Sequence, residues 1–292
     1  MREFISFTLS GVSFGMIYAA VALSLVLIWR ATRILNFAQG GMAMFTTYLA
    51  LSVIRHTGSY WLGFTTALAA GLLLGAAIER VVVRPVENAP PLNAIIVTLG
   101  VLTFLEGLAG ILYGGQFKSF PSAFSIRGIK VGSDRIALSP FDMFIIGAML
   151  GVAVLLALMF RFTAVGLRMR AAAFEADVAR LLGVRVGRVL TLGWALAGLL
   201  GSLAGVLVSP ATLLHPNSMD PLFVLGFTAA VLGGLDSPLG AVVGGLVLGV
   251  GLSYVGGYLG SDLVTLFGFG LLVLVLMVRP QGLFSRTTTR QV

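Results

Sequence analysis

The carboxyl group of Glu106 is the first candidate for chemistry, because it interrupts a long apolar stretch, TLGVLTFLEGLAG, that contains no Lys or Arg. If this stretch crosses a bilayer, a charged side chain near its centre costs about 2.5–3.5 kcal/mol on insertion scales. Such residues usually face a bundle interior or a wet cavity, where they bind protons, cations or polar substrates. The alternative is structural: a protonated Glu106 hydrogen-bonded between helices, or one wetted at the interface.

The segment RILNFAQGGMAMF (33–45) places polar and flexible residues between two apolar runs. Asn36 and Gln39 supply amide donors and acceptors. Gly40 and Gly41 allow a helix break or the close approach of a neighbouring backbone. Non-helical backbone at membrane depth is tolerated where it is buried or lines a cavity, and Gly-interrupted membrane segments often mark transport paths.

A second interruption lies at 233–240, where Gly233 and Gly234 come shortly before a proline. We expect this segment and 36–41 to line or gate the inner part of a transport path. The alternative is that both are packing elbows, with Asn36 capping the helix that follows it.

Catalytic and metal-binding patterns are absent from the sequence. It has no Cys, and its two histidines, His56 and His215, lie far apart and outside any metal-ligand spacing. GVSFG (11–15) fits the letters GxSxG but lies inside an apolar run and not at the strand-to-helix turn of a serine hydrolase, and there is no GxxxxGK[ST] phosphate-binding loop. We therefore expect no enzyme activity, metal or cofactor in this chain. If ATP drives its function, another subunit must bind the ATP.

The overall composition is that of an integral membrane protein. Of 292 residues, 58% are hydrophobic and only 10% are charged, with a mean hydropathy of +1.03. Soluble domains usually carry about 25% charged residues, so most of this surface cannot face water. The formal net charge of +8 indicates Arg in cytoplasmic loops rather than nucleic-acid binding, since no basic patch with interleaved aromatic residues occurs.

Apolar runs predict an all-α, polytopic helical bundle of eight or nine transmembrane helices within one domain, residues 1–292. Nine is preferred, and re-entrant or discontinuous segments are expected where Asp236-Ser237-Pro238 follows a short run at 222–235. The runs long enough to cross about 30 Å of hydrocarbon are at roughly 6–28, 37–54, 61–78, 92–113, 141–160, 189–209, 238–258 and 262–278.

Basic residues predict the orientation. With nine spans and the N-terminus outside, most Arg residues fall in loops that are then cytoplasmic, including an Arg-rich loop at about 161–188. This asymmetry favours an external N-terminus and a cytoplasmic C-terminus. Asp142 and Asp262 stand at predicted helix starts, where carboxylates suit the helix dipole.

GxxxG patterns predict close helix packing. They occur at Gly11/Gly15, Gly71/Gly75, Gly110/Gly114, Gly147/Gly151, Gly201/Gly205 and Gly245/Gly249.

The loop at 161–188 contains the pattern of a charged amphipathic helix over 168–182, which Gly183 is placed to end. Asp177 and Arg180 can pair at a spacing of three residues. Such a helix either lies in the lipid headgroups or docks into a groove of a soluble partner, and its residue pattern leaves both open. The apolar stripe consists of Phe174, Val178, Leu181 and Leu182.

Five segments in this order resemble the branched-chain amino acid ABC transporter permeases of the LivH type, over nearly the whole chain. They are RILNFAQGGMAMFTTYLA (33–50), ERVVVRPV (79–86), RAAAFEADVARLLGVRVGRV (170–189), VLGGLDSPLGAVVGG (231–245) and RPQGLF (279–284). The sequence departs from the family pattern at Gly41, where many members carry Glu, and at Asp236, where Gly is frequent. Glu175 and Asp177 make the coupling segment more acidic than expected.

This resemblance implies a permease subunit in a bacterial cytoplasmic membrane that works with several partners. They are a LivM-like second permease or a homodimer mate, two cytoplasmic ATPase subunits and an external binding protein that delivers the amino acid. The resemblance places ATPase docking on a coupling helix that includes Arg170, Phe174, Glu175, Asp177, Val178, Arg180, Leu182 and Gly183.

Two alternative functions remain open from the sequence. One is an ABC permease for urea or short-chain amides, which belongs to the same superfamily. The other is a secondary transporter or channel driven by an ion gradient, with Glu106 as the proton or cation site; it predicts uptake without ATPase subunits.

Overall fold

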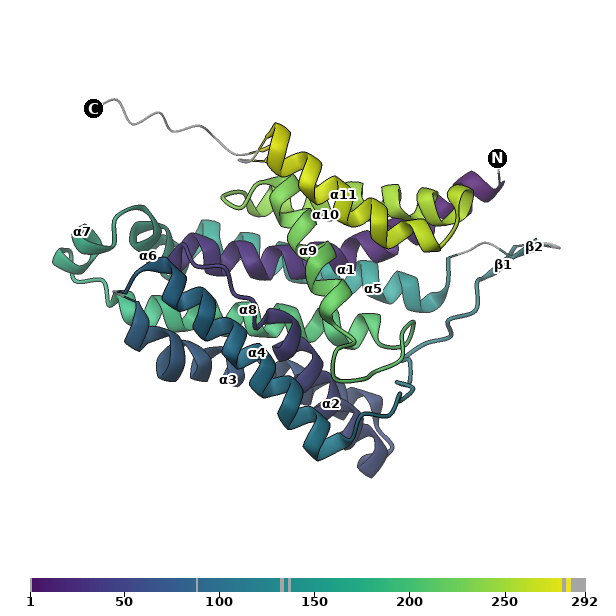
Figure 1. Cartoon of the computed structure of the whole chain (residues 1–292), viewed down its shortest axis with the longest axis horizontal. Helices are drawn as coiled ribbons and strands as arrows, with labels where there is room; N and C mark the ends of the chain where they lie inside the picture. Colours follow the sequence, from purple (N-terminus) through teal and green to yellow (C-terminus); the bar gives the residue numbers. More distant parts are fainter. Residues whose placement is uncertain (1, 88, 132–133, 136–137, 280–281, 285–292) are drawn as a thin grey trace.

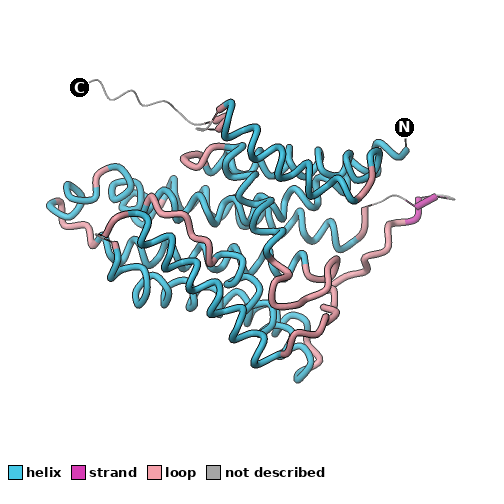
Figure 2. The backbone as a smooth tube through the Cα atoms, in the orientation of Figure 1, coloured by secondary structure: helices cyan, strands magenta, loops and turns pink. Residues whose placement is uncertain are grey.

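The computed structural model describes residues 2–87, 89–131, 134–135, 138–279 and 282–284, and this described part is almost entirely helical (Figure 2). Its α-helices are α1 (Arg2–Thr32), α2 (Gln39–Thr57), α3 (Tyr60–Ile78), α4 (Pro91–Tyr113), α5 (Pro140–Phe162), α6 (Ala164–Phe174), α7 (Ala176–Leu181), α8 (Val186–Val208), α9 (Asp220–Gly233), α10 (Pro238–Tyr254) and α11 (Asp262–Val278).

Short irregular elements extend or connect these helices. A π-helical turn (Glu79–Val83) and a 3-10 turn (Arg84–Val86) continue α3, and a second π turn (Val255–Leu259) continues α10. Two strands, β1 (Lys130–Val131) and β2 (Asp134–Arg135), pair in an antiparallel hairpin between α4 and α5.

The predicted all-α polytopic bundle is confirmed. Each of the nine apolar runs forms a helix, and six helices in the described part are long and apolar enough to cross a membrane: α1, α3, α4, α5, α8 and α10. Helix α9 has 14 residues, or about 21 Å at 1.5 Å per residue. That is shorter than the hydrocarbon core, so α9 by itself is too short for a full span.

Helix α1 runs through the middle of the bundle, flanked by α8, α9 and α10 (Figure 1). Helices α4 and α5 lie at the periphery and are mostly exposed. Figure 1 places α6 and α7 at one end of the bundle and the N-terminus with the β1–β2 hairpin at the other.

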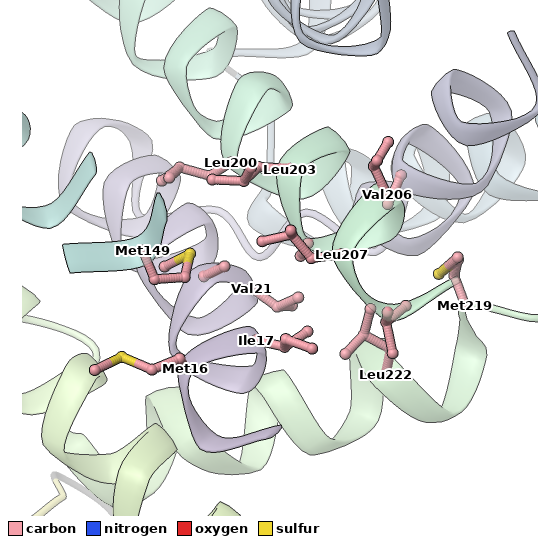
Figure 3. Close-up of a cluster of buried hydrophobic side chains, with 14 of the residues drawn as sticks. Met16, Ile17, Val21, Met149, Leu200, Leu203, Val206, Leu207, Met219 and Leu222 are labelled. Atoms are coloured by element: carbon pink, nitrogen blue, oxygen red, sulfur yellow. The ribbon is translucent and has the colours of Figure 1, made fainter. Parts of the chain in front are cut away.

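The largest hydrophobic cluster joins α1 to α2, α5, α8, α9 and α10, and Figure 3 shows its part between α1, α5, α8 and the start of α9. Hydrocarbon gives little solvent-driven force between membrane helices, so close packing of such side chains holds the bundle together. The labelled members are Met16, Ile17, Val21, Met149, Leu200, Leu203, Val206, Leu207, Met219 and Leu222.

Glycines allow α1 and α10 to approach at backbone contact. Gly11 and Gly15 face Gly245 and Gly249, and a Cβ atom added at Gly245 would lie 2.6 Å from the backbone nitrogen of Ala19. The GxxxG prediction is therefore confirmed for this helix pair.

The other GxxxG pairs divide into two groups. Gly71/Gly75 of α3 pack against α8, and Gly201/Gly205 of α8 pack against α2. By contrast, no described atom outside the adjoining residues and the local helix backbone lies within 4 Å of a Cβ added at Gly110/Gly114 or Gly147/Gly151. The last two pairs make no helix contact within the described part of the chain.

The predicted cap at the start of α5 is confirmed and also ties two helices together. The Ser139 hydroxyl accepts a hydrogen bond from the Asp142 backbone N–H (3.1 Å), and Asp142 Oδ2 accepts one from the Ser139 N–H (2.9 Å). Asp142 Oδ1 also accepts a hydrogen bond from Ser13 Oγ of α1 at 2.7 Å.

Candidate transport path and coupling segment

The first glycine-interrupted segment is a buried, non-helical elbow between α1 and α2. Arg33 reverses the chain with a φ of +57°, and α2 begins at Gln39. The side chains of Asn36 and Gln39 are fully buried, with exposures of 0% and 1%. Two amides with no access to solvent require hydrogen-bond partners within the protein.

Both amides have such partners. Asn36 Oδ1 accepts a hydrogen bond from the Ala38 N–H at 3.0 Å, and Asn36 Nδ2 donates to Gln39 Oε1 at 3.1 Å. Gln39 Nε2 donates to the carbonyl oxygen of Ala197, in the middle of α8, at 2.8 Å. Asn36 thus orders the turn that enters α2, and Gln39 fastens that turn to α8.

Gly40 and Gly41 allow α2 to touch two further helices. A Cβ at Gly40 would lie 3.2 Å from Cβ of Phe223 on α9, and one at Gly41 would lie 2.9 Å from Cδ1 of Leu102 on α4. The start of α2 is therefore enclosed by α4, α8 and α9.

The second glycine-interrupted segment forms the tight turn between α9 and α10. Gly233 and Gly234 are buried; Gly234 has a φ of +97°, and the backbones of Gly233 and Gly240 are in contact. Asp236 in this turn forms an ion pair with Arg33 at the start of the elbow. The structure therefore joins the two interrupted segments, although they are about 200 residues apart in the sequence.

Glu106 lies partly exposed on α4, with the side chains of Asp220 and Asn217 close to its carboxyl group. Sequence analysis missed Asp220, whose only signal is its place directly before the short apolar run of α9. Two partly exposed carboxyl groups beside each other are costly if lipid covers them. This face of α4 and α9 therefore suits contact with water or with another protein.

A polar cluster that the sequence did not predict lies where α3 meets the start of α8. The buried carboxylate of Glu79 accepts hydrogen bonds from Arg84 Nε (3.0 Å) and Nη2 (2.9 Å), and one from Thr191 Oγ1 at 2.6 Å. Arg84 Nη2 also donates to the carbonyl oxygen of Gly187 at 2.8 Å. We call Glu79, Arg84 and Thr191 the α3–α8 clamp.

The predicted continuous helix over 168–182 is wrong. The segment forms two helices, α6 and α7, with a corner at Glu175, whose backbone is extended (φ −153°, ψ 101°). The corner lets the buried Met169 of α6 and Ala179 of α7 both pack on the first turns of α8. We call residues 164–183 the coupling segment.

Other features of the coupling segment follow the prediction. Arg180 Nη1 donates a hydrogen bond to Asp177 Oδ1 at 2.8 Å, and Gly183 ends the helical region with a φ of +82°. Arg180 also lies 3.6 Å from the carboxylate of Glu87, three residues after Arg84 of the clamp. The exposed side chains of the apolar stripe are those of Phe174, Val178, Leu181 and Leu182.

We expect Gln39→Ala to lower the thermal midpoint of the purified protein. The substitution removes the donor to the Ala197 carbonyl and the acceptor for Asn36 Nδ2, and each buried group left unsatisfied costs about 1–3 kcal/mol. The matched control is Ser202→Ala, because the buried Ser202 hydroxyl bonds only a carbonyl of its own helix. Equal midpoints for the two variants would contradict the fastening role of Gln39.

Six helices long and apolar enough to cross a membrane place the described part of the chain in the class of polytopic helical membrane proteins. Residues 7–276 match a family model described as branched-chain amino acid transport system / permease component. This match covers most of the sequence, so the chain belongs to that family, as the five resembling segments predicted.

Individual relatives agree with the family match. The high-affinity branched-chain amino acid transport system permease protein LivH of Salmonella typhimurium is 31% identical over 298 residues, covering 97% of this chain and 96% of the relative. The corresponding Escherichia coli K12 protein is 30% identical over 300 residues, with the same coverage. BraD of Pseudomonas aeruginosa is 27% identical over 295 residues, again covering 97% and 96%.

Solved structures with the same fold are more distant in sequence. A metal-chelate type ABC transporter in an inward-facing conformation has a TM-score of 0.53 and 18% identity, covering 93% of this chain and 88% of that one. PsaBC from Streptococcus pneumoniae has a TM-score of 0.51 and 14% identity, covering 96% and 93%. At these identities the likeness establishes the fold alone.

Proposed function

We propose that this chain is the membrane-spanning permease subunit of an ATP-driven importer and forms the path for branched-chain amino acids delivered by an external binding protein. The observation that carries this proposal is the end-to-end similarity to LivH and BraD, whose names state that transport activity. The membrane is the bacterial inner membrane, with the N-terminus outside and the C-terminus in the cytoplasm.

Two cytoplasmic ATPase subunits, separate from this chain, supply the energy, and one of them docks on the coupling segment. Its exposed apolar side chains support this assignment: Leu181 and Leu182 are 88% and 77% exposed. Apolar residues on a charged, membrane-adjacent segment suit burial in a groove of a soluble partner. Closure of the ATPases then moves α6 and α7 as a lever against α8.

A second permease, LivM-like or an identical copy, completes the path. The face of α4 and α9 that carries Glu106 and Asp220 supports a path on that side, because these carboxyl groups need water or protein beside them. The buried elbow at 36–41 and the turn at 233–240 act as its inner gate. If the Asn36→Ala variant takes up substrate at the wild-type rate per folded copy, Asn36 has no role in this gate.

The function is tested by uptake of labelled leucine into proteoliposomes that contain this chain, its partner permease and the ATPases, with the binding protein outside. We expect uptake only when ATP is trapped inside the vesicles. Equal uptake without ATP would overturn the proposal and favour an ion-coupled transporter. ATPase stimulation by a urea-loaded binding protein, with no leucine uptake, would support the ATP-driven importer but assign it urea instead of a branched-chain amino acid.

We expect the double variant Leu181→Ser/Leu182→Ser to fold normally and to lose most ATPase association, because both side chains are exposed and pack on nothing essential to the fold. Co-purification of the ATPases measures the association. The control is Leu213→Ser, which removes a half-exposed leucine from the loop between α8 and α9. Full association of the ATPases with the double variant would exclude α7 as their docking site.

A further inference from the structure

A cavity of about 700 Å³ opens at the end of the bundle where α1, α5 and α10 meet beside α6. Its rim carries four arginines: Arg30, Arg33, Arg161 and Arg170. Arg33 is paired with Asp236, which also lines the cavity. Within the described residues, the other three guanidinium groups have no carboxylate partner. The rim is therefore strongly positive.

The inner wall of the cavity is apolar. Helix α1 contributes Leu23 and Leu27, α5 contributes Leu156 and Ala157, and α10 contributes Val242. Leu23 precedes the rim arginine of α1 by seven residues, which is about 10 Å along a helix. A polar opening thus leads into an apolar slot that extends about two helical turns along α1.

The rim lies at a membrane boundary. Helix α1 ends at Thr32, α5 ends at Phe162, and α10 begins at Pro238, and all three are long enough to span a bilayer. The arginines therefore stand at headgroup level, and the apolar slot reaches into the hydrocarbon. This is the end of the bundle that carries the coupling segment and that the charge distribution predicts to be cytoplasmic.

We propose that this cavity binds an anionic phospholipid, with the headgroup phosphate between Arg30, Arg161 and Arg170 and an acyl chain in the apolar slot. Guanidinium groups bind phosphate oxygens in pairs and remain charged at all physiological pH values. The cytoplasmic leaflet supplies anionic lipid at this depth. A soluble anion would pair with the arginines of the rim but would leave the apolar slot in contact with water.

The bound lipid also has a mechanical consequence. Arg170 and Phe174 line the cavity and belong to α6, the first helix of the coupling segment. A lipid held between α6 and the ends of α1 and α5 fastens this segment to the membrane bundle.

The first test is native mass spectrometry of the full chain with phosphatidylglycerol titrated against a phosphatidylcholine background. We expect Arg30→Gln/Arg161→Gln/Arg170→Gln to weaken phosphatidylglycerol binding at least tenfold. The control, Arg80→Gln/Arg185→Gln/Arg188→Gln, removes the same charge from exposed arginines outside the cavity and should change binding less than twofold. Equal losses in the two triple variants would mean non-specific attraction and would overturn the proposal.

A second test distinguishes a lipid from free phosphate and leaves every arginine in place. Ala157→Phe fills the apolar slot from an exposed position on α5, so it disturbs no packed core. Phosphatidylglycerol should raise the thermal midpoint of the wild type but not of this variant. If inorganic phosphate at matched ionic strength raises both midpoints as much as phosphatidylglycerol does, the occupant is a soluble anion and the lipid proposal is wrong.

Discussion

Replacing Arg84 with Met is expected to destabilise the protein by about 3 kcal/mol, the lower end of the cost of breaking a buried ion pair, because the Arg84 side chain itself is 33% exposed. The side chain of Glu79 is 2% exposed, so its carboxylate would remain buried without its charged partner. The substitution also removes the donor to the Gly187 carbonyl that ties α3 to the start of α8. The decrease in stability is measured by thermal unfolding of the purified protein, with the folded fraction recorded against temperature.

Two controls separate this effect from a simple change of charge. Arg80→Met removes an exposed arginine one helical turn away and should change stability by less than about 0.5 kcal/mol. Adding Glu79→Gln to Arg84→Met should restore part of the loss, because a neutral amide is less costly to bury than a carboxylate. A single Arg84→Met variant as stable as Arg80→Met would show that the clamp does not stabilise the fold.

Replacing Gly245 with Val should prevent α10 from docking on α1. The new Cβ would lie 2.6 Å and 2.7 Å from the backbone nitrogen and Cα of Ala19, and a backbone cannot move aside as a flexible side chain can. Overpacking of a core usually costs about 1–3 kcal/mol, and rigid backbone contacts place this site at or above the upper limit. Size-exclusion chromatography of the detergent-solubilised protein should show little folded material.

The chain contains a matched control for this experiment. Gly147 also belongs to a GxxxG pair within a membrane helix, but nothing described lies within 4 Å of a Cβ added there. Gly147→Val should therefore yield normal amounts of folded protein. If both variants fold equally well, close approach at Gly245 is not what holds α1 against α10.

The helices were predictable from the sequence because their signal is local. Each apolar run becomes a helix, and the proline after Asp236 marks the break between α9 and α10. The corner at Glu175 was not predictable, because AAAFEADVA contains only residues that tolerate a helix. The corner comes from packing: it lets Met169 and Ala179 reach the same end of α8.

The candidate site was only partly predictable, for a related reason. The buried amides Asn36 and Gln39 stood out because they interrupt an apolar pattern. Thr191 of the clamp and Asp220 beside Glu106 did not stand out, because each is more than 100 residues away from its partner in the sequence. A single sequence without homologues gives no signal for pairs at that separation.

The π-helical turn Glu79–Val83 has a consequence for insertions and deletions. Its backbone closes with the N–H of Arg84 bonded to the carbonyl of Glu79, five residues earlier, so the turn contains one residue more than an α-helical turn. Deleting a single residue within it would let the same N–H and carbonyl close an ordinary α-helical turn. Arg84 would still lie about one turn from Glu79, on the same face of the helix. The clamp therefore tolerates a change of one residue in the length of this turn better than it tolerates the loss of Arg84.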